Sequence, residues 1–253
     1  MKHGKMILEA CVDSPESAIA AERGGADRLE LCGHLIIGGV TPDEWLYRSV
    51  REHSDLPARV LIRPRFGDFC YTEEEFQMME HQVAHFREMG ADAVVIGCLK
   101  TDGSLDLERM KRLIDLAGDM EITLHRAFDV CRDPEEALEQ ACSLGIGTIL
   151  TSGQEESALK GADCLKRLQQ IAGDRITLMA GAGIHAASIE KLYPMTGIYA
   201  YHMSGKKTLS SSMMYRREGV PMGLPGISEF EIWRTDEQEI LAASHVLSHF
   251  CEK

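Results

Sequence analysis

The sequence lacks the segments that would place a protein in or across a membrane. Residues 1–5 are polar and lead directly into a short apolar run that contains Glu9. The long apolar stretch and the small-residue cleavage site of a secretory signal peptide are therefore missing. No uncharged apolar stretch approaches the roughly 20 residues that a membrane-spanning helix needs. We expect a cytoplasmic protein without a membrane partner.

Basic residues are scarce relative to acidic ones. The chain has 27 Lys and Arg against 40 Asp and Glu, which gives a formal net charge of −13. Such a charge repels nucleic acids and anionic lipids, so we expect no nucleic-acid partner. The 8 cysteines contain no C-x-x-C pair and are too sparse for a disulfide scaffold. Reduced thiols in a cytoplasmic protein are the simplest interpretation. Apolar residues make up 44% of the chain, enough to bury a large core.

The sequence does contain a repeating pattern of short apolar segments rich in β-branched residues. Their starts lie 21 to 34 residues apart, the length of one strand plus one crossover helix. These segments are residues 6–11, 27–32, 58–63, 92–97, 121–125, 147–151, 175–180 and 198–202. Crossovers of that length imply parallel strands. The pattern therefore predicts an α/β fold, a single-domain (β/α)8 TIM barrel that spans residues 1–253.

Three of the predicted helices begin with a capping side chain followed by proline and acidic residues. These starts are Ser14-Pro15-Glu16, Thr41-Pro42-Asp43-Glu44 and Asp133-Pro134-Glu135-Glu136. After the eighth strand, the sequence predicts a long irregular loop over residues 204–235 and a final helix over residues 236–249. We expect so long a loop to cover the barrel or to contact a second subunit.

Polar residues gather where the predicted strands end, which is where TIM barrels carry their chemistry. Strand alternation places Glu9 on the same face as Cys11, and Glu30 on the same face as Cys32. Both pairs are expected to point into the barrel mouth, with Arg63, Arg65 and Arg126 neutralising the carboxylates. The candidate catalytic residues are Glu9, Glu30, Arg63, Arg65, Asp68, His125, Arg126, Asp129 and His202. A salt-bridged plug that only closes the barrel is the alternative interpretation.

Glycines after the seventh predicted strand indicate a candidate oxyanion site. Gly181 and Gly183 precede a helix, and Ser204 follows the eighth strand. TIM barrels often bind phosphate on backbone N–H groups at this place, although a tight turn also requires glycine. The same glycines are a poor dinucleotide fingerprint, because no acidic residue lies about 20 residues further on. We expect no nucleotide cofactor.

Several motifs resemble those of the CutC copper-homeostasis family. They are Arg28-x-Glu30-Leu31-Cys32, Arg63-Pro64-Arg65-x-Gly67-Asp68-Phe69-x-Tyr71, His125-Arg126-Ala127-Phe128-Asp129, Thr151-Ser152-Gly153-Gln154 and Met179-Ala180-Gly181-Ala182-Gly183. The resemblance extends from Glu9 to about Tyr215, and it departs from the family in the loop 33–37 and after Arg217. It implies a cytosolic TIM barrel that forms a homo-oligomer, a dimer or higher, and handles copper.

Two functions stay open at this point. In the first, Cys11 and Cys32 end adjacent strands ~5 Å apart and both bind one copper ion, because Cu(I) prefers sulfur ligands. In the second, the chain is an enzyme that acts on a small phosphorylated or carboxylated metabolite. Gly181, Gly183 and Ser204 then hold the anion, and acidic or histidine side chains at the mouth transfer a proton. The predicted partner is accordingly a copper ion or a small anionic ligand.

Overall fold

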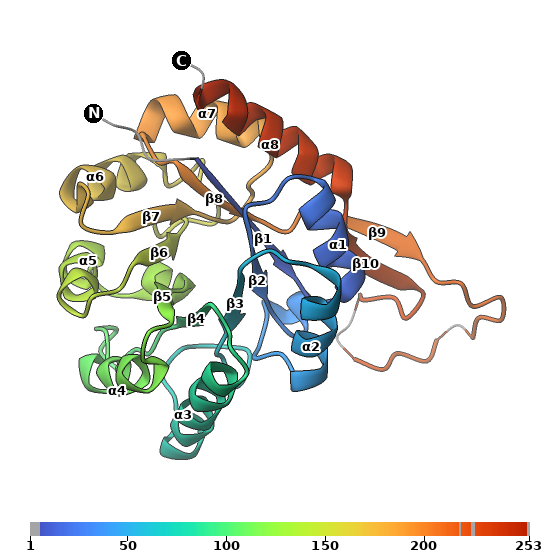
Figure 1. The fold of residues 1–253 in the computed structure, drawn as a ribbon, viewed down its shortest axis with the longest axis horizontal. Coiled ribbons are helices and arrows are strands. Elements are labelled where there is room, and N and C mark those ends of the chain that lie inside the picture. The colour runs from blue at the N-terminus through green and yellow to red at the C-terminus, as the bar shows by residue number, and fades with distance from the viewer. Residues whose placement is uncertain (1–5, 218, 224–225, 252–253) are drawn as a thin grey trace.

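A closed barrel of parallel strands, surrounded by helices, forms the centre of the molecule in the computed structural model (Figure 1). The structure describes residues 6–217, 219–223 and 226–251, so residues 1–5, on which the signal-peptide expectation rests, lie outside it. The barrel strands are β1 (Ile7–Val12), β2 (Arg28–Leu31), β3 (Ala58–Leu61), β4 (Ala93–Ile96), β5 (Glu121–Leu124), β6 (Thr148–Thr151), β7 (Thr177–Ala180) and β8 (Ala200–Met203). The predicted TIM barrel is confirmed, and each observed strand begins and ends within two residues of its expected position.

Helices follow the strands in turn and form the outer layer of the barrel (Figure 1). The α-helices are α1 (Pro15–Arg23), α2 (Glu44–His53), α3 (Glu73–Glu88), α4 (Leu107–Ala117), α5 (Pro134–Ser143), α6 (Ala162–Ala172), α7 (Ala186–Thr196) and α8 (Glu237–Cys251). Two short 3₁₀ helices, η1 (Leu35–Ile37) and η2 (Arg126–Val130), lie in loops at the carboxyl ends of β2 and β5. Within the described ranges, no helix is both long and apolar enough to span a bilayer.

Two of the three predicted helix starts are confirmed. Ser14 caps α1 by accepting the Ser17 N–H at 3.2 Å, and Asp133 caps α5. The start of α2 was predicted two residues too early: Asp43, not Thr41, is the cap, because its carboxylate accepts two backbone N–H groups of the first turn. The Thr41 hydroxyl instead accepts the backbone N–H of Arg63 at 2.8 Å, which ties this loop to the end of β3.

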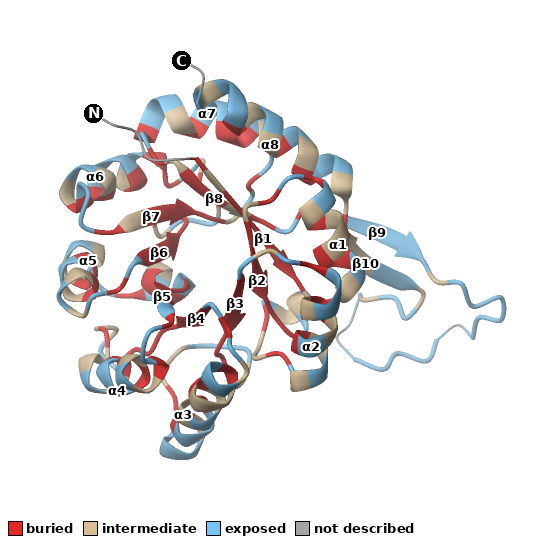
Figure 2. Cartoon of the chain, viewed as in Figure 1, coloured by how far each residue is buried: buried red, intermediate tan, exposed pale blue. Residues whose placement is uncertain are grey.

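The main hydrophobic core lies between the barrel and the helices. Outward-facing strand residues such as Leu8 and Leu29 pack there, as does one face of α3, whose Phe76 and Val83 are fully buried. Figure 2 shows this pattern, with buried strands and exposed outer helix faces. Inside the barrel, by alternation, lie two small separate clusters, one around Leu61 and one around Met179.

The segment that joins β8 to α8 is not irregular throughout residues 204–235, which corrects that prediction. Strands β9 (Lys206–Ser210) and β10 (Glu231–Thr235) pair in antiparallel fashion as a ribbon that projects from the barrel beside α1 (Figure 1). The backbone N–H of Thr235 donates to Ser17 Oγ of α1 at 3.1 Å and anchors the base of this ribbon. All five residues of β9 are exposed, so an alternation of apolar and polar residues could not reveal the strand.

Candidate functional site

A cavity of about 340 Å³ opens at the carboxyl ends of the barrel strands. Its volume lies within the ~300–1,000 Å³ that is typical of small-molecule sites. Seven of the predicted site residues line it: Cys11, Glu30, Arg63, His125, Arg126, His202 and Ser204. The prediction that strand ends carry the polar site therefore agrees with the position of this cavity.

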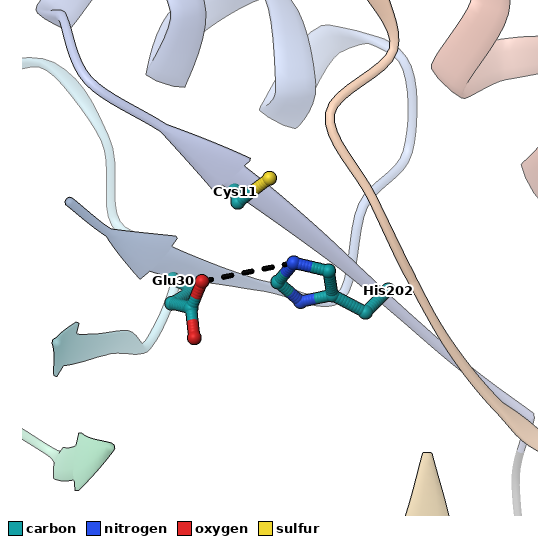
Figure 3. A group of neighbouring side chains, drawn as sticks. All are labelled: Cys11, Glu30 and His202. Atoms are coloured by element: carbon teal, nitrogen blue, oxygen red, sulfur yellow. Dashed lines mark ion pairs between the residues drawn. The ribbon is translucent and has the colours of Figure 1, made fainter. Parts of the chain in front are cut away.

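Cys11, Glu30 and His202 form a compact group on one side of the cavity. They come from the adjacent strands β1, β2 and β8, and their side chains converge on one space (Figure 3). One ligand atom from each lies within 4.8 Å of the others, and His202 Nε2 is 3.6 Å from Glu30 Oε2. A thiol, an imidazole and a carboxylate so close together can bind a metal ion or exchange protons.

Glu9 lies beneath this group and is fully buried. Its carboxylate accepts a hydrogen bond from Arg28 Nε at 2.6 Å, and Arg59 Nε lies 3.6 Å away. On the other side, Glu9 Oε1 is 2.9 Å from His202 Nδ1. Burial by itself would raise the pKa of Glu9, but His202, Arg28 and Arg59 together hold that pKa lowered to about 2. The ionised Glu9 therefore accepts the Nδ1–H of His202 and leaves Nε2 to face Cys11 and Glu30.

The pKa values of Glu30, Cys32 and His202 are also shifted, each for an identifiable physical reason. Burial, and secondarily Glu9, raise the pKa of Glu30. Burial and then the Glu30 charge raise the pKa of the Cys32 thiol well above its usual value, and Cys32 Sγ donates to Glu30 at 3.4 Å. Burial would lower the pKa of His202, but Cys11, Glu30 and Glu9 more than offset it and raise that pKa well above 6.5. The Cys32 thiol thus donates to Glu30, and it is not one of the three side chains that converge within 4.8 Å.

Arg63 and His125 are on the β3 and β5 side of the same cavity. The Arg63 guanidinium donates to the carbonyl oxygens of Gly38, Gly39 and Gly67, and it lies 4.9 Å from the centre of the Phe69 ring. The His125 ring also packs on Phe69, with ring centres 4.8 Å apart. These contacts hold both side chains in fixed positions at the wall of the cavity.

Other predicted site residues are engaged elsewhere. Arg65 pairs with Asp68 and Glu75 in the exposed loop before α3. Asp129 accepts hydrogen bonds from the hydroxyls of Thr151 and Ser152 and from Arg126, so it organises the loop after β6. None of Arg65, Asp68 and Asp129 lines the cavity.

Gly181 and Gly183, the glycines predicted to bind an oxyanion, do not line the cavity. The backbone N–H of Gly181 donates to the carbonyl oxygen of Thr151 at 2.9 Å, which continues the β6–β7 ladder and removes that donor from any ligand. Gly183 has a left-handed φ of 72°, as a tight turn requires. Only Ser204 of this set lines the cavity, and it is exposed.

Sequence reasoning missed several residues that complete the site. Arg28 and Arg59, rather than the predicted Arg63, Arg65 and Arg126, neutralise Glu9. Strand alternation backward from Glu30 would have placed Arg28 inside the barrel. The ribbon contributes Lys206, Trp233 and Arg234 to the cavity rim, and the Lys206 ammonium lies 3.5 Å from the centre of the Trp233 ring. No pattern in the sequence indicated this last contribution.

The fold and site define a (β/α)8 barrel with a thiol, imidazole and carboxylate group at its mouth. Residues 6–207 match the model of the CutC family, and the chain belongs to that family. It is 42% identical to the family protein CutC of Chromobacterium violaceum over 95% of this chain and 98% of the relative. It is 43% identical to that of Parabacteroides distasonis over 94% of this chain and 99% of the relative.

A solved structure supports the same assignment. This chain is similar to a crystal structure from Streptococcus agalactiae, with a TM-score of 0.74 and 28% identity. The protein in that structure is described as the copper homeostasis protein CutC. The similarity covers 79% of this chain and 98% of that one. The predicted resemblance to the CutC family is therefore confirmed.

Proposed function

We propose that this protein binds Cu(I) at the barrel mouth and takes part in copper homeostasis. Cys11 Sγ and His202 Nε2 are the proposed ligands, with Glu30 beside them. The observation that carries the proposal is the convergence of these three side chains within 4.8 Å. The name of the Streptococcus agalactiae relative supports the biological role.

The chemistry of the donor set fits this ion. Cu(I) favours soft sulfur ligands, and imidazole suits copper as well. Ligating histidines commonly donate their second ring N–H to a carboxylate, which fixes the ring and raises its basicity. Glu9 has that position next to His202, at 2.9 Å. The proposal thus keeps Cys11 from the predicted pair and replaces Cys32 with His202.

A cytoplasmic location accompanies the proposal. All 8 cysteines are free thiols, as expected for a reducing compartment, where a Cu(I) site on a thiol remains intact. The net charge of −13 also favours a cation over a nucleic acid as partner.

A competition titration tests the copper proposal. The protein and a chromogenic Cu(I) chelator compete for the metal under reducing, anaerobic conditions. We expect Cys11→Ser and His202→Gln each to weaken binding by at least about tenfold, because each removes one ligand. Cys98→Ser is the matched control, since Cys98 is also buried near a strand end but packs in the outer core. Equal affinities of Cys11→Ser and Cys98→Ser for Cu(I) would overturn the proposal.

A second function, acid–base catalysis on a small anionic metabolite, is favoured by one specific observation. His202 and Glu30, which can exchange protons, line the same cavity as Arg63 and His125, which can donate hydrogen bonds to an anion. This function requires that an anion binds in the cavity. If neither phosphate nor acetate binds to the metal-free protein, this function is excluded.

A further inference from the structure

Arg63 has a buried positive charge without a negative partner. The residue is only 8% exposed, and its guanidinium forms no ion pair with any carboxylate of the described residues. Three N–H groups donate to carbonyl oxygens of two loops, whereas the buried Nε has no hydrogen-bond partner there. An unpaired buried charge is unfavourable, so a negative group that enters the cavity beside Arg63 would stabilise this arrangement.

His125 provides a second unpaired donor at the same wall. The residue is 4% exposed, and its Nδ1 accepts the backbone N–H of Ala127 at 3.1 Å. Burial, together with the nearby Arg63 charge, lowers the pKa of His125 to about 3, so the ring is neutral at ordinary pH. The single ring proton is therefore on Nε2, and this buried nitrogen has no partner among the described residues.

The backbone around these two side chains is built to hold them. A Cβ on Gly97 would lie 2.5 Å from His125 Cε1, so only glycine at the end of β4 leaves room for the ring. Gly38 and Gly39 have left-handed φ angles of 88° and 81°, and these turns aim their carbonyl oxygens at Arg63. The Arg63 and His125 donors are thus preorganised before any ligand arrives.

The charges around the cavity differ between its two sides. Arg63 and Arg126 line it on the β3 and β5 side, whereas Glu30 and Asp13 belong to the part built from β1 and β2, beside which the ribbon adds Lys206 and Arg234 at the rim. A ligand that carries a negative group at one end fits this distribution. The cavity of about 340 Å³ is also far larger than one metal ion needs.

We propose that Arg63 and His125 bind the oxyanion group of a small organic molecule, a carboxylate or a phosphate monoester, in this cavity. A guanidinium suits either anion because its planar N–H groups match the spacing of two oxygens. This site differs from the predicted glycine turn at Gly181 and Gly183. The inference does not depend on the copper proposal, since none of the proposed copper ligands takes part in it.

Thermal unfolding of metal-free protein tests the inference. Inorganic phosphate and acetate are titrated separately in the presence of a chelator, with chloride keeping the ionic strength fixed. A ligand that binds only the folded state raises the melting temperature. We expect one or both anions to do so, and whichever acts identifies the source of the oxyanion. A melting temperature that neither anion changes would overturn the inference.

Variants locate the effect on the proposed residues. We expect Arg63→Met to weaken binding of the active anion by at least tenfold, which corresponds to about 1.4 kcal/mol. Arg65→Met is the matched control, because Arg65 lies two residues away, pairs with Asp68 and Glu75, and does not line the cavity. Equal anion responses of the two variants would contradict the role of Arg63.

Nuclear magnetic resonance of the native protein gives a readout that needs no variant. We expect the ¹⁵N and ¹H signals of His125 Nε2 to shift on titration with the anion, while those of His81 on α3, which does not line the cavity, stay in place. A constant His125 signal, or equal shifts of both histidines, would overturn the inference even if Arg63→Met does not fold. Because the copper titration uses other residues, either proposal can fail alone.

Discussion

Replacing Glu9 with glutamine tests the buried charge network under the site. The substitution keeps the shape of the side chain but removes the negative charge that faces Arg28 and Arg59. The pKa of Glu9 falls from 4.5 to about 2 on folding, and at ~1.4 kcal/mol for each pH unit this is on the order of 3 kcal/mol. Breaking a buried ion pair by removal of one partner independently costs about 3–5 kcal/mol. We therefore expect Glu9→Gln to lower the free energy of unfolding by ~3–5 kcal/mol near neutral pH.

The pH dependence of this effect has a defined sign. The folded-state pKa of Glu9 is depressed, so its contribution is complete above the unfolded-state value of 4.5 and is lost as the pH falls toward 2. Urea unfolding near pH 7 and near pH 3.5 measures this. The difference between wild type and Glu9→Gln should shrink by roughly 1.4 kcal/mol at the lower pH.

Glu121→Gln is the control for this prediction. Glu121 also pairs with Arg59, but its side chain is 70% exposed, and exposed pairs contribute less than about 1 kcal/mol. If both variants lost the same small amount of stability, or if the Glu9→Gln deficit did not change with pH, the assignment of Glu9 as an ionised buried carboxylate would be refuted.

Three further predictions follow from single features of the structure. Gly97→Ala should lower the free energy of unfolding by about 1–3 kcal/mol and abolish the stabilisation by anions, because its Cβ would displace the His125 ring. Thermal melts with and without anion measure both effects. Unchanged stabilisation by the anion would show that anion binding does not need the His125 ring. The pKa of His125 is lowered from 6.5 to about 3, so the stability that its neutral ring contributes is complete above pH 6.5 and falls below it. Wild type should accordingly lose roughly 2 kcal/mol more than His125→Phe between about pH 6.5 and 4.5 in urea titrations, and parallel titrations would contradict this. The apolar side chains of Met214, Tyr215 and Met222 are 98%, 66% and 76% exposed, so we expect copies of the chain to associate through this segment. Analytical ultracentrifugation should show an oligomer, and the double variant Met214→Ser/Met222→Ser should weaken it. A monomeric wild-type protein would contradict the prediction.

The barrel could be predicted because its signals are local. β-Branched runs, their spacing and capping residues such as Ser14 and Asp133 act within a few residues of the chain. The same locality placed Glu9, Cys11 and Glu30 inside the mouth by alternation alone. The ribbon escaped prediction because all of β9 is exposed and its hydrogen bonds join residues more than twenty positions apart.

The pairing of charges could not be read from the sequence because it depends on register between strands. Glu9 is level with Arg28 in the parallel pairing of β1 and β2, whereas Arg63 lies beyond the end of β3 and faces the loops. Which arginine meets which carboxylate is set by the stagger of the closed barrel. The sequence therefore identified charged residues for the mouth but not their partners.

X-ray absorption at the copper edge tests the central claim most directly. The Cu(I)-loaded native protein should show a sulfur scatterer and an imidazole nitrogen around the metal, as Cys11 and His202 require. Cys11→Ser should lose the sulfur scatterer, and Cys98→Ser should keep it. Sulfur coordination that is unchanged in Cys11→Ser would contradict the account.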